Sequence, residues 1–347
     1  MPTIRKPETW YQSLSIDVFL PSQDELGVAA FFAWILPLLV LARGALSSDP
    51  ILVASTGIAV ATTLLWVLSL LNQRVAYGPA RHVNLSEEVV VITGGASGLG
   101  LLLAETLGMK GAAVAVLDVK QMQDEVYGVE FYSCNVSDKD DVERAAQRIR
   151  DELGDPTILI NNAGVVNGKR LLDLNKTDIE RNFQCNLVAH FYTIQAFLPG
   201  MLRSKTGGTI VTIASVLGYL GAARLSDYTA SKAGLLAMHA SLRAELEQMN
   251  DDSARNIRTI LVTPGQLGTD MFKGVESPSS FVGPVVQPLD LVKKLIDMIH
   301  HGKSGELSMP AYARWIKWYY VFPAGLQRVF RWASGVDRAM DGFRKDG

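Results

Sequence analysis

The sequence has few cysteines and histidines, and its charges nearly cancel. Two cysteines, Cys134 and Cys185, are too few for a disulfide framework, and each falls in an apolar stretch typical of a core, which fits a domain facing a reducing compartment. The five histidines have no ligand-like spacing with the cysteines or with a carboxylate, so we expect no catalytic metal. A net charge of −2 lacks the basic excess of a protein that binds nucleic acid.

Apolar residues, in contrast, are abundant. They make up 48% of the 347 residues, charged residues make up 20%, and the mean hydropathy is +0.16. This balance is more apolar than that of a typical soluble enzyme and predicts that part of the chain lies in a membrane. The uncharged stretch Ile51–Leu71 has the length of a transmembrane helix. Acidic residues before the first apolar run, and the lack of a cleavage site, disfavour a signal peptide.

A shorter apolar stretch, Gly27–Ala42, precedes this one and contains Pro37. It either spans marginally, forms half of a hairpin or lies in the interface. If both stretches insert, the N-terminus and the rest of the chain share the cytosolic side. The alternative is two buried helices of a soluble domain, but helices this uniformly apolar rarely fit a domain surface. The predicted organisation is an N-terminal segment (1–26), a membrane hairpin or transmembrane helices (27–71), a linker (72–85), a main domain (86–310) and a tail (311–347).

After Ser86 short β-branched runs alternate with amphipathic stretches, which predicts an α/β fold with a parallel sheet and helices on both faces. Strands are expected over 88–94, 112–118, 130–136, 157–163, 209–215, 257–265 and 306–309. Helices are expected over Leu99–Lys110, Asp138–Leu153, Asp178–Arg203, Asp227–Met249 and Leu289–His301. The segment Phe272–Pro288 is rich in Pro, Ser and Gly and is expected to be a loop that covers a cleft.

A glycine-rich turn, Thr93–Gly100, follows the first predicted strand and opens a helix. Its glycines allow a pyrophosphate to approach backbone amides at a helix N-terminus, which predicts a dinucleotide-binding loop. Asp118 ends the next strand about 20 residues later, where it accepts hydrogen bonds from ribose hydroxyls and repels a 2′-phosphate. NAD is therefore favoured, although Lys120 leaves NADP open. The alternative for Asp118 is a solvated carboxylate at a strand end.

Further motifs follow in order. They are Gly94-x-x-x-Gly98-x-Gly100, Asn161-Asn162-Ala163-Gly164, Ser215 and Tyr228-x-x-x-Lys232. In type, order and distance they resemble the short-chain dehydrogenase/reductase superfamily over residues 86–310. The resemblance implies a single Rossmann-type, doubly wound parallel sheet of about seven strands and nicotinamide-dependent hydride transfer.

The chemistry of this constellation can also be argued from the residues. A tyrosine with an ordinary pKa of about 10 is too weak a base for an alcohol proton unless its anion is stabilised. Lys232 lies one helical turn from Tyr228 and supplies positive charge, while Ser215 can hydrogen-bond the substrate oxygen. Each residue alone also suits a structural role. Ser215 lacks the Gly-x-Ser-x-Gly elbow of a lipase.

The resemblance adds roles that the residues alone do not give. Asn186 matches an asparagine that holds a water in a proton relay, and Lys232 matches a lysine that holds the nicotinamide ribose. Asn135 stands where many members have Asp near the adenine, and Leu267 stands where Ile or Val is more usual. The expected cofactor contacts are Gly94, Ser97, Gly98, Leu99, Gly100, Asp118, Asn135, Val136, Asn162, Ala163, Gly164, Tyr228, Lys232, Pro264, Gly265, Leu267 and Thr269.

The tail interleaves aromatic and cationic residues over Ala311–Ala333. Residues 311–347 carry seven Lys or Arg against three Asp, a balance of about +4. This pattern at helical spacing suits a segment lying at a bilayer surface. The alternative is a helix that packs its rings on the domain or on a partner subunit.

Together these features predict a membrane-anchored oxidoreductase acting on a lipophilic alcohol or ketone, with Tyr228 as the acid/base. The layout resembles the membrane-bound branch with retinol dehydrogenases and 17-beta-hydroxysteroid dehydrogenases. That implies a retinoid, steroid or long-chain lipid substrate, and a cytosol-facing domain on the endoplasmic reticulum or a lipid droplet. Members also pair through the helices carrying Asn186 and Tyr228, which implies a homodimer. Two alternatives stay open, an NADPH-linked 3-keto-lipid reductase and a catalytically silent cofactor-binding scaffold at the lipid surface.

Overall fold

A computed structural model of the chain describes residues 23–249, 251–275 and 283–343. The chain divides into two compact units, one of residues 13–79 and one that contains residues 80–347. Most of the predicted N-terminal segment (1–26) and residues 276–282 of the predicted cover loop lie outside the described residues.

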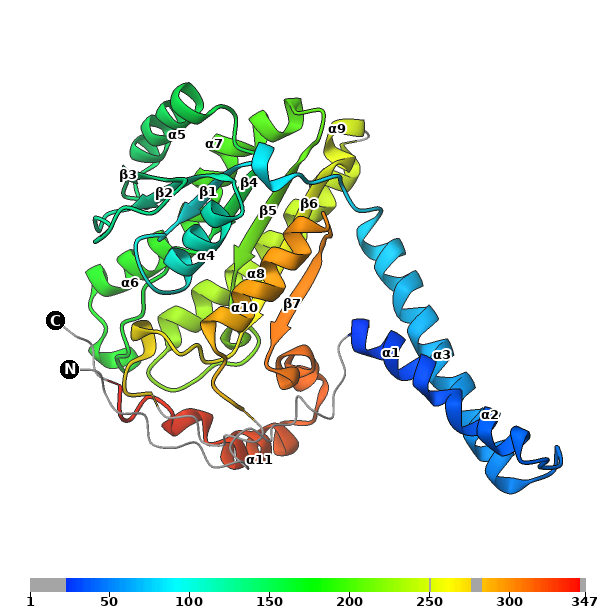
Figure 1. Cartoon of the computed structure of the whole chain (residues 1–347). Coiled ribbons are helices and arrows are strands. Elements are labelled where there is room, and N and C mark those ends of the chain that lie inside the picture. Colours follow the sequence, from blue (N-terminus) through cyan, green and yellow to red (C-terminus); the bar gives the residue numbers. More distant parts are fainter. Residues whose placement is uncertain (1–22, 250, 276–282, 344–347) are drawn as a thin grey trace. The chain divides into compact units, whose positions relative to one another are not determined.

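The larger unit is built on one parallel sheet (Figure 1). Its strand order is β3-β2-β1-β4-β5-β6-β7, so the direction of winding reverses between β1 and β4. All seven predicted strands form, and so do four of the five predicted helices; the fifth, Asp178–Arg203, is interrupted. The strands are β1 (Val89–Thr93), β2 (Ala113–Asp118), β3 (Val129–Ser133), β4 (Ile158–Asn161), β5 (Gly208–Ile213), β6 (Ile257–Pro264) and β7 (Gly305–Met309).

Each face of the sheet has its own hydrophobic core. Alternation along β1 sends Val90 and Ile92 to one face and Val91 to the other, so the strand is a continuous apolar run buried on both sides. The first face is covered by α4 (Gly98–Met109) and α10 (Pro288–His300). The opposite face is covered by α5 (Lys139–Leu153), α7 (Ala189–Arg203) and α8 (Ser226–Gln248).

The helix predicted over Asp178–Arg203 is interrupted. The structure has α6 (Lys176–Phe183), a π-helical turn η5 (Gln184–Val188) and then α7. A capping box between Asn175 and Asp178 fixes the start of α6, where each side chain bonds the other residue's backbone. The π turn inserts one extra residue per turn and so re-aims the side chains around Asn186.

The remaining elements are short. They are η3 (Leu85–Glu87), η4 (Leu171–Asp173), η6 (Val216–Gly218), α9 (Asp252–Arg255), η7 (Asp270–Phe272), η8 (Ala311–Arg314), η9 (Ile316–Val321), α11 (Ala324–Ser334) and η10 (Val336–Arg338). The first half of the tail forms 3-10 turns, and only α11 in its second half is an α-helix.

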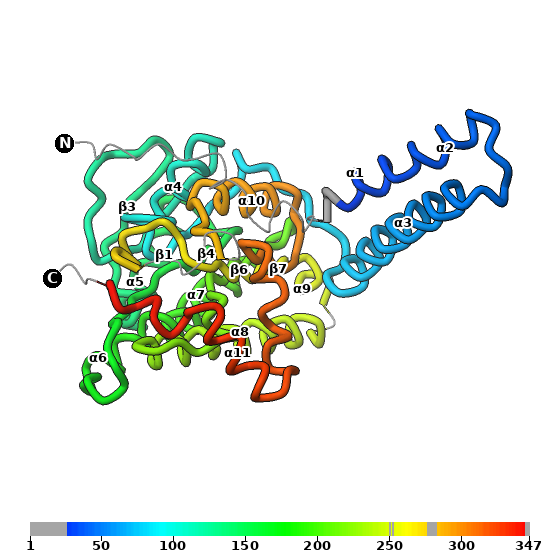
Figure 2. Tube along the Cα trace, turned by 90° about the horizontal axis from the view of Figure 1, so that it is seen from below, coloured from blue at the N-terminus to red at the C-terminus, as the bar shows by residue number. Residues whose placement is uncertain are grey.

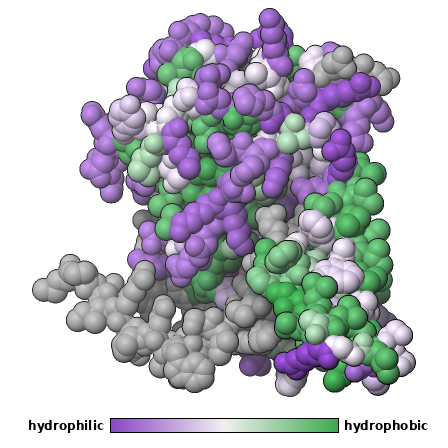
Figure 3. Space-filling model, turned by 45° about the vertical axis from the view of Figure 1, so that its right-hand side comes forward, coloured by the Kyte–Doolittle hydropathy of each residue, from purple (hydrophilic) through white to green (hydrophobic). Residues whose placement is uncertain are grey.

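The smaller unit consists of α1 (Gln23–Ala33), α2 (Ile35–Ala42) and α3 (Pro50–Tyr77), with α1 and α2 lying beside α3 (Figure 2). Trp34 Nε1 donates to Thr63 Oγ1 at 3.0 Å. The surface of these helices is largely apolar (Figure 3). Helix α3 has the length and composition to cross a membrane, and it extends six residues into the segment predicted as a linker.

A buried ion pair fastens the start of the larger unit to its sheet. Arg81 and Glu88 are joined by two hydrogen bonds of 3.0 and 2.9 Å, and both side chains are almost fully buried. Arg81 Nε also donates to Thr209 Oγ1 at 3.0 Å, and Thr157 Oγ1 donates to Glu88. The pair ties the chain before β1 to β4 and β5.

We expect Arg81→Met to lower the free energy of unfolding by about 3–5 kcal/mol, because it leaves the Glu88 carboxylate buried without its partner. Thermal unfolding of the detergent-solubilised protein measures this loss. Lys139→Met is the matched control, since Lys139 pairs with Glu143 on the exposed surface at 3.6 Å and such pairs contribute less than about 1 kcal/mol. Equal losses in the two variants would contradict the assigned role of the buried pair.

Candidate active site

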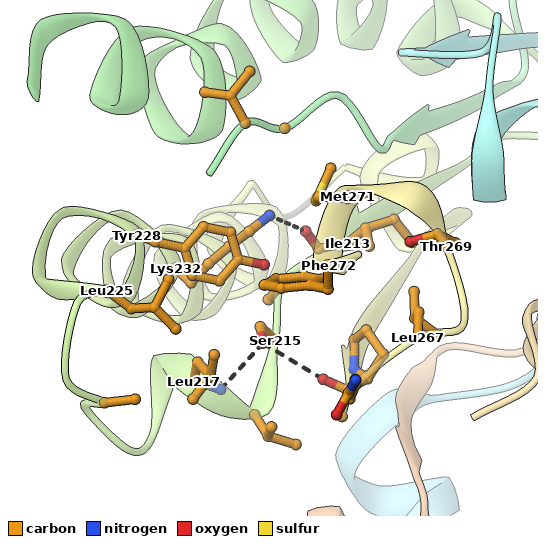
Figure 4. A pocket seen from close by; sticks show the side chains of 18 of the residues that line it. Ile213, Ser215, Leu217, Leu225, Tyr228, Lys232, Leu267, Thr269, Met271 and Phe272 are labelled. Atoms are coloured by element: carbon orange, nitrogen blue, oxygen red, sulfur yellow. Dashed lines mark hydrogen bonds between the residues drawn. The ribbon is translucent and has the colours of Figure 1, made fainter. Parts of the chain in front are cut away.

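The site lies at the carboxyl ends of the strands, across the reversal between β1 and β4. A cavity of about 1030 Å³ opens there, lined by residues that follow six of the seven strands. Side chains from α8 and from η7 form part of its wall (Figure 4). Side chains from the tail complete it. In parallel sheets this edge, at the point where the winding reverses, is the usual place for a ligand.

The glycine-rich turn after β1 forms one end of the cavity. Gly94 has a φ of +65°, and a Cβ there would lie 2.8 Å from the Cα of Ala163. A Cβ on Gly100 would lie 2.2 Å from the carbonyl oxygen of Gly94. Asn162 Nδ2 donates to the carbonyls of Thr93 and Gly94 at 3.1 and 3.0 Å. The turn is therefore tight and rigid, and it directs the N-terminus of α4 at the cavity.

Asp118 lies at the end of β2 and lines the cavity next to this turn. One carboxylate oxygen accepts from Ala96 N at 3.0 Å and the other from Lys120 N at 2.9 Å. These bonds hold a negative charge in place beside the glycine-rich turn. Backbone amides at the N-terminus of α4, with a fixed carboxylate beside the glycine-rich turn, fit the pyrophosphate and adenosine ribose of a dinucleotide cofactor.

Ser215, Tyr228 and Lys232 meet in the middle of the cavity (Figure 4). Ser215 follows β5 and its Oγ accepts from Leu217 N at 3.1 Å, while Tyr228 and Lys232 share one face of α8. Lys232 Nζ donates to the carbonyl of Ile213 at 2.9 Å and lies 5.7 Å from the centroid of the Tyr228 ring. Both α8 side chains are buried, with 4% and 3% of their surface exposed.

Burial moves the pKa values of both α8 residues. It raises the pKa of Tyr228 to about 12, although a hydrogen bond with Ser215 acts in the opposite direction. It lowers the pKa of Lys232 to about 8, because the ammonium has lost most of its water. At neutral pH the structure therefore holds a protonated tyrosine beside a lysine that is still charged.

Asn186 lies behind the cavity wall in the π turn and is fully buried. Its Oδ1 accepts from Val165 N at 2.7 Å, and its Nδ2 donates to Val165 O at 2.9 Å and lies 3.3 Å from Ser231 Oγ. These bonds join the loop after β4 to helix α8 immediately before Lys232. The water relay implied for Asn186 stays a prediction.

The other predicted site residues, apart from Gly100, all line the cavity. They are Gly94, Ser97, Gly98, Leu99, Asp118, Asn135, Val136, Asn162, Ala163, Gly164, Ser215, Tyr228, Lys232, Pro264, Gly265, Leu267 and Thr269. Gly100 acts through its close approach to Gly94. Their roles toward a cofactor stay predictions.

The opposite end of the cavity is mainly apolar, and most of the residues that line it were not predicted as site residues from the sequence. Phe272 packs edge to face on the Tyr228 ring, with the ring centroids 5.8 Å apart. The tail contributes much of this wall through Tyr312, Trp315, Ile316, Tyr319, Phe322, Phe330, Arg331, Ala333, Ser334, Val336, Ala339 and Met340. The sequence predicts a loop that covers the cleft and a tail rich in aromatic rings. It does not show which of those rings face the cavity.

Three comparisons with known proteins agree with this geometry. Residues 88–279 match the short chain dehydrogenase family. Human epidermal retinol dehydrogenase 2 is 33% identical over 278 residues, which cover 76% of this chain and 88% of that protein. Retinol dehydrogenase 10 of Rattus norvegicus is 35% identical over 65% of this chain and 74% of its own length. A short chain dehydrogenase of Burkholderia cenocepacia, solved in complex with NADP, is 26% identical with a TM-score of 0.59, over 71% of this chain and 97% of that one.

Proposed function

This chain belongs to the short-chain dehydrogenase/reductase family and is an NAD(P)-dependent oxidoreductase, and we propose that it acts on a lipophilic alcohol or ketone at a membrane. The observation that supports this substrate class is the cavity itself. Its polar end fits a dinucleotide, and beyond Ser215 and Tyr228 most of the wall is aromatic and aliphatic, with Arg331 and Ser334 as polar residues of the tail. An apolar wall of this kind favours a substrate whose only polar group is the reacting oxygen.

We assign the proton transfer to Tyr228. Oxidation of the alcohol sends a hydride from the carbinol carbon to the cofactor and the hydroxyl proton to Tyr228 Oη, and reduction of the carbonyl reverses both transfers. A nicotinamide bound at the polar end supplies the hydride acceptor or donor. Tyr228 has to be anionic to receive the proton. Because burial raises its pKa to about 12, the tyrosine is protonated at neutral pH and is in the form that donates a proton.

In this proposal Lys232 stabilises the anion of Tyr228, and Ser215 stabilises the charge that develops on the substrate oxygen. Lys232 carries a charge 5.7 Å from the Tyr228 ring, and both side chains are buried, so the charge stabilises the phenolate more than it would in solvent. Ser215 Oγ lies where it can donate to the substrate oxygen as negative charge develops there. Asn186 is a positioning residue, because its amide fixes the backbone around Ser231 and Val165.

Helix α3 carries the proposed membrane anchor. It has 28 residues, and the hydroxyls of Thr62 and Thr63 are bonded to carbonyls one turn earlier in the same helix. Polar groups satisfied inside their own helix are compatible with a lipid environment. We propose that α3 spans the bilayer, that α1 and α2 insert beside it, and that the membrane is the endoplasmic reticulum or a lipid-droplet surface.

The assay that tests the function is nicotinamide reduction by the detergent-solubilised chain. NAD and NADP are offered separately, each with retinol, a 17-beta-hydroxysteroid and a long-chain alcohol, and the corresponding carbonyls are offered with the reduced cofactors. Turnover of one lipid pair fixes the substrate class and the cofactor together. Cofactor binding without turnover of any of them would overturn the proposal in favour of a silent scaffold.

Asp118→Asn tests the proposed preference for NAD. The variant keeps an oxygen that accepts from a loop amide and removes the charge that repels a 2′-phosphate. We expect the ratio of kcat/KM for NAD over NADP to fall by about tenfold, equivalent to ~1.4 kcal/mol. The ratio is the measured quantity because any loosening of the loop lowers both values. Asp124→Asn, outside the cavity lining, is the control, and an unchanged ratio in Asp118→Asn would refute the assignment.

A further inference from the structure

Helix α11 turns polar side chains toward the domain, whereas an amphipathic helix of a soluble protein normally turns its apolar side inward. None of its residues is buried, and Gln327 and Arg331 are the only two that are not exposed. Arg331 Nη1 donates to the carbonyl of Gly221 at 2.8 Å, and Gln327 Nε2 donates to the carbonyl of Phe322 at 2.8 Å. The polar side of α11 therefore faces the protein.

The apolar side of α11 faces outward. Leu326, Val329, Phe330 and Ala333 recur at helical spacing along one side, and we call these four residues the outer stripe. The three large side chains are each about half exposed. An amphipathic helix of a soluble domain normally turns this side to the core, so an outer stripe indicates an apolar partner.

The outer stripe meets the cavity at Phe330 and Ala333. Phe322 and Phe330 both line the cavity and both stay exposed, and their ring centroids are 5.4 Å apart. Inward from this pair the wall continues through the buried side chains of Tyr319 and Met340, and Met340 packs in one cluster with Tyr228. An apolar lining thus runs from the outer stripe to the reacting hydroxyl.

The charges around the outer stripe favour an anionic lipid surface over a second copy of the chain. Residues 311–343 carry five Lys or Arg and two Asp, and Arg328 is exposed within α11. Exposed Trp315 and Trp318 precede it. Indole rings and cations beside an apolar stripe suit the headgroup region of a bilayer. A second copy carries the same positive balance in this segment, so a contact between two copies would bring like-charged tails together.

We propose that the outer stripe lies in the surface of a bilayer that contains anionic lipid, and that the cavity opens beside the contacting rings of Phe322 and Phe330. This opening, which we call the mouth, is where the substrate passes from that bilayer to Tyr228. This inference rests on the proposed function, which supplies the substrate class. It narrows the substrate class to an elongated lipid, with its reacting oxygen at Tyr228 and its apolar remainder directed toward the mouth.

Contact between the outer stripe and the bilayer can be tested without an activity assay. A spin label on Val329→Cys in the full-length chain, reconstituted in vesicles of phosphatidylcholine and phosphatidylserine, reports collision with oxygen, which enters lipid, and with a nickel chelate, which stays in water. Leu172→Cys is the control, because Leu172 is 96% exposed and lies outside the tail. We expect the label at 329 to favour oxygen and the label at 172 to favour nickel. A water-exposed label at 329, or spin–spin broadening from a second copy, would overturn the bilayer contact.

The mouth is tested by Leu326→Asp, which places a charge in the outer stripe at a residue that does not line the cavity. In vesicles we expect kcat/KM to fall about tenfold for the lipid alcohol that the wild type oxidises. For a short, water-soluble alcohol the value should stay unchanged. Leu172→Asp should alter neither value. An equal loss of kcat/KM for both alcohols, or no loss for either, would refute the proposed entry route. A wild-type protein that is inactive on every alcohol would refute the proposed function itself.

Discussion

Tyr228→Phe is expected to lower kcat by about three orders of magnitude, within the range that a positioned general acid or base contributes. The phenyl ring keeps the edge-to-face contact with Phe272 and the packing around Met340, so only the hydroxyl is lost. Because the hydroxyl exchanges the proton in both directions, oxidation and reduction should fall together. Single-turnover rates of the detergent-solubilised variant measure the effect.

Two controls separate this loss from damage to the fold. The affinity for the cofactor, measured by fluorescence titration, should stay near the wild-type value, because the predicted cofactor contacts other than Tyr228 are spread over the loops after several strands and are unchanged in the variant. Tyr127→Phe makes the same chemical change at a residue that is 83% exposed and should leave kcat unchanged. A Tyr228→Phe protein with undiminished turnover would mean that another group transfers the proton.

The sheet was predictable because its strands carry their own signal. Parallel strands buried on both faces appear as short β-branched runs, and each run was separated from the next by an amphipathic stretch. The polar end of the site follows from the same fact, since residues after β1, β2 and β5 must meet at one edge of a parallel sheet. Local sequence and one rule of topology therefore predict that the glycine-rich turn, Asp118 and Ser215 lie at one edge of the sheet, whereas the role of Asn186 is implied only by the family resemblance.

The π turn at Asn186 was not predictable. Nothing in Gln184–Val188 disfavours an ordinary α-helix, and the sequence predicts one helix through this segment. The extra residue is stabilised by bonds from Asn186 to Val165 and Ser231, which come from the loop after β4 and from α8. Partners that are brought together only by the finished fold leave no trace in local periodicity.

The tail shows a different limit. Its periodicity identifies an amphipathic segment, but the period does not say which side faces the protein. The usual assumption, apolar side inward, gives the opposite orientation to the one that Arg331 imposes through its bond to Gly221. The substrate end of the cavity depends on this orientation, which is why the motifs predict the chemistry and leave the apolar wall undetermined.

Lys232→Met is expected to remove turnover and at the same time to stabilise the fold at neutral pH. Burial lowers the pKa of Lys232 to about 8 from an ordinary value of 10.5. Between those two pH values the unfolded chain binds a proton that the folded chain does not bind, so wild-type stability rises with pH across this window. Below pH 8 both states are protonated, and the folded state bears the full cost of a buried ammonium, on the order of 3 kcal/mol.

The measurement is the difference in free energy of unfolding between Lys232→Met and the wild type, followed from pH 7 to pH 10.5 without cofactor. The variant should be more stable at pH 7, and its advantage should shrink as the pH rises past 8, because the wild type then sheds the costly proton. Lys139→Met, at an exposed lysine, controls for a generic lysine-to-methionine effect. A pH-independent difference would show that the charge of Lys232 is not strained by burial. A declining one, together with lost turnover, would mean that the site retains a destabilising charge because the Tyr228 anion requires it.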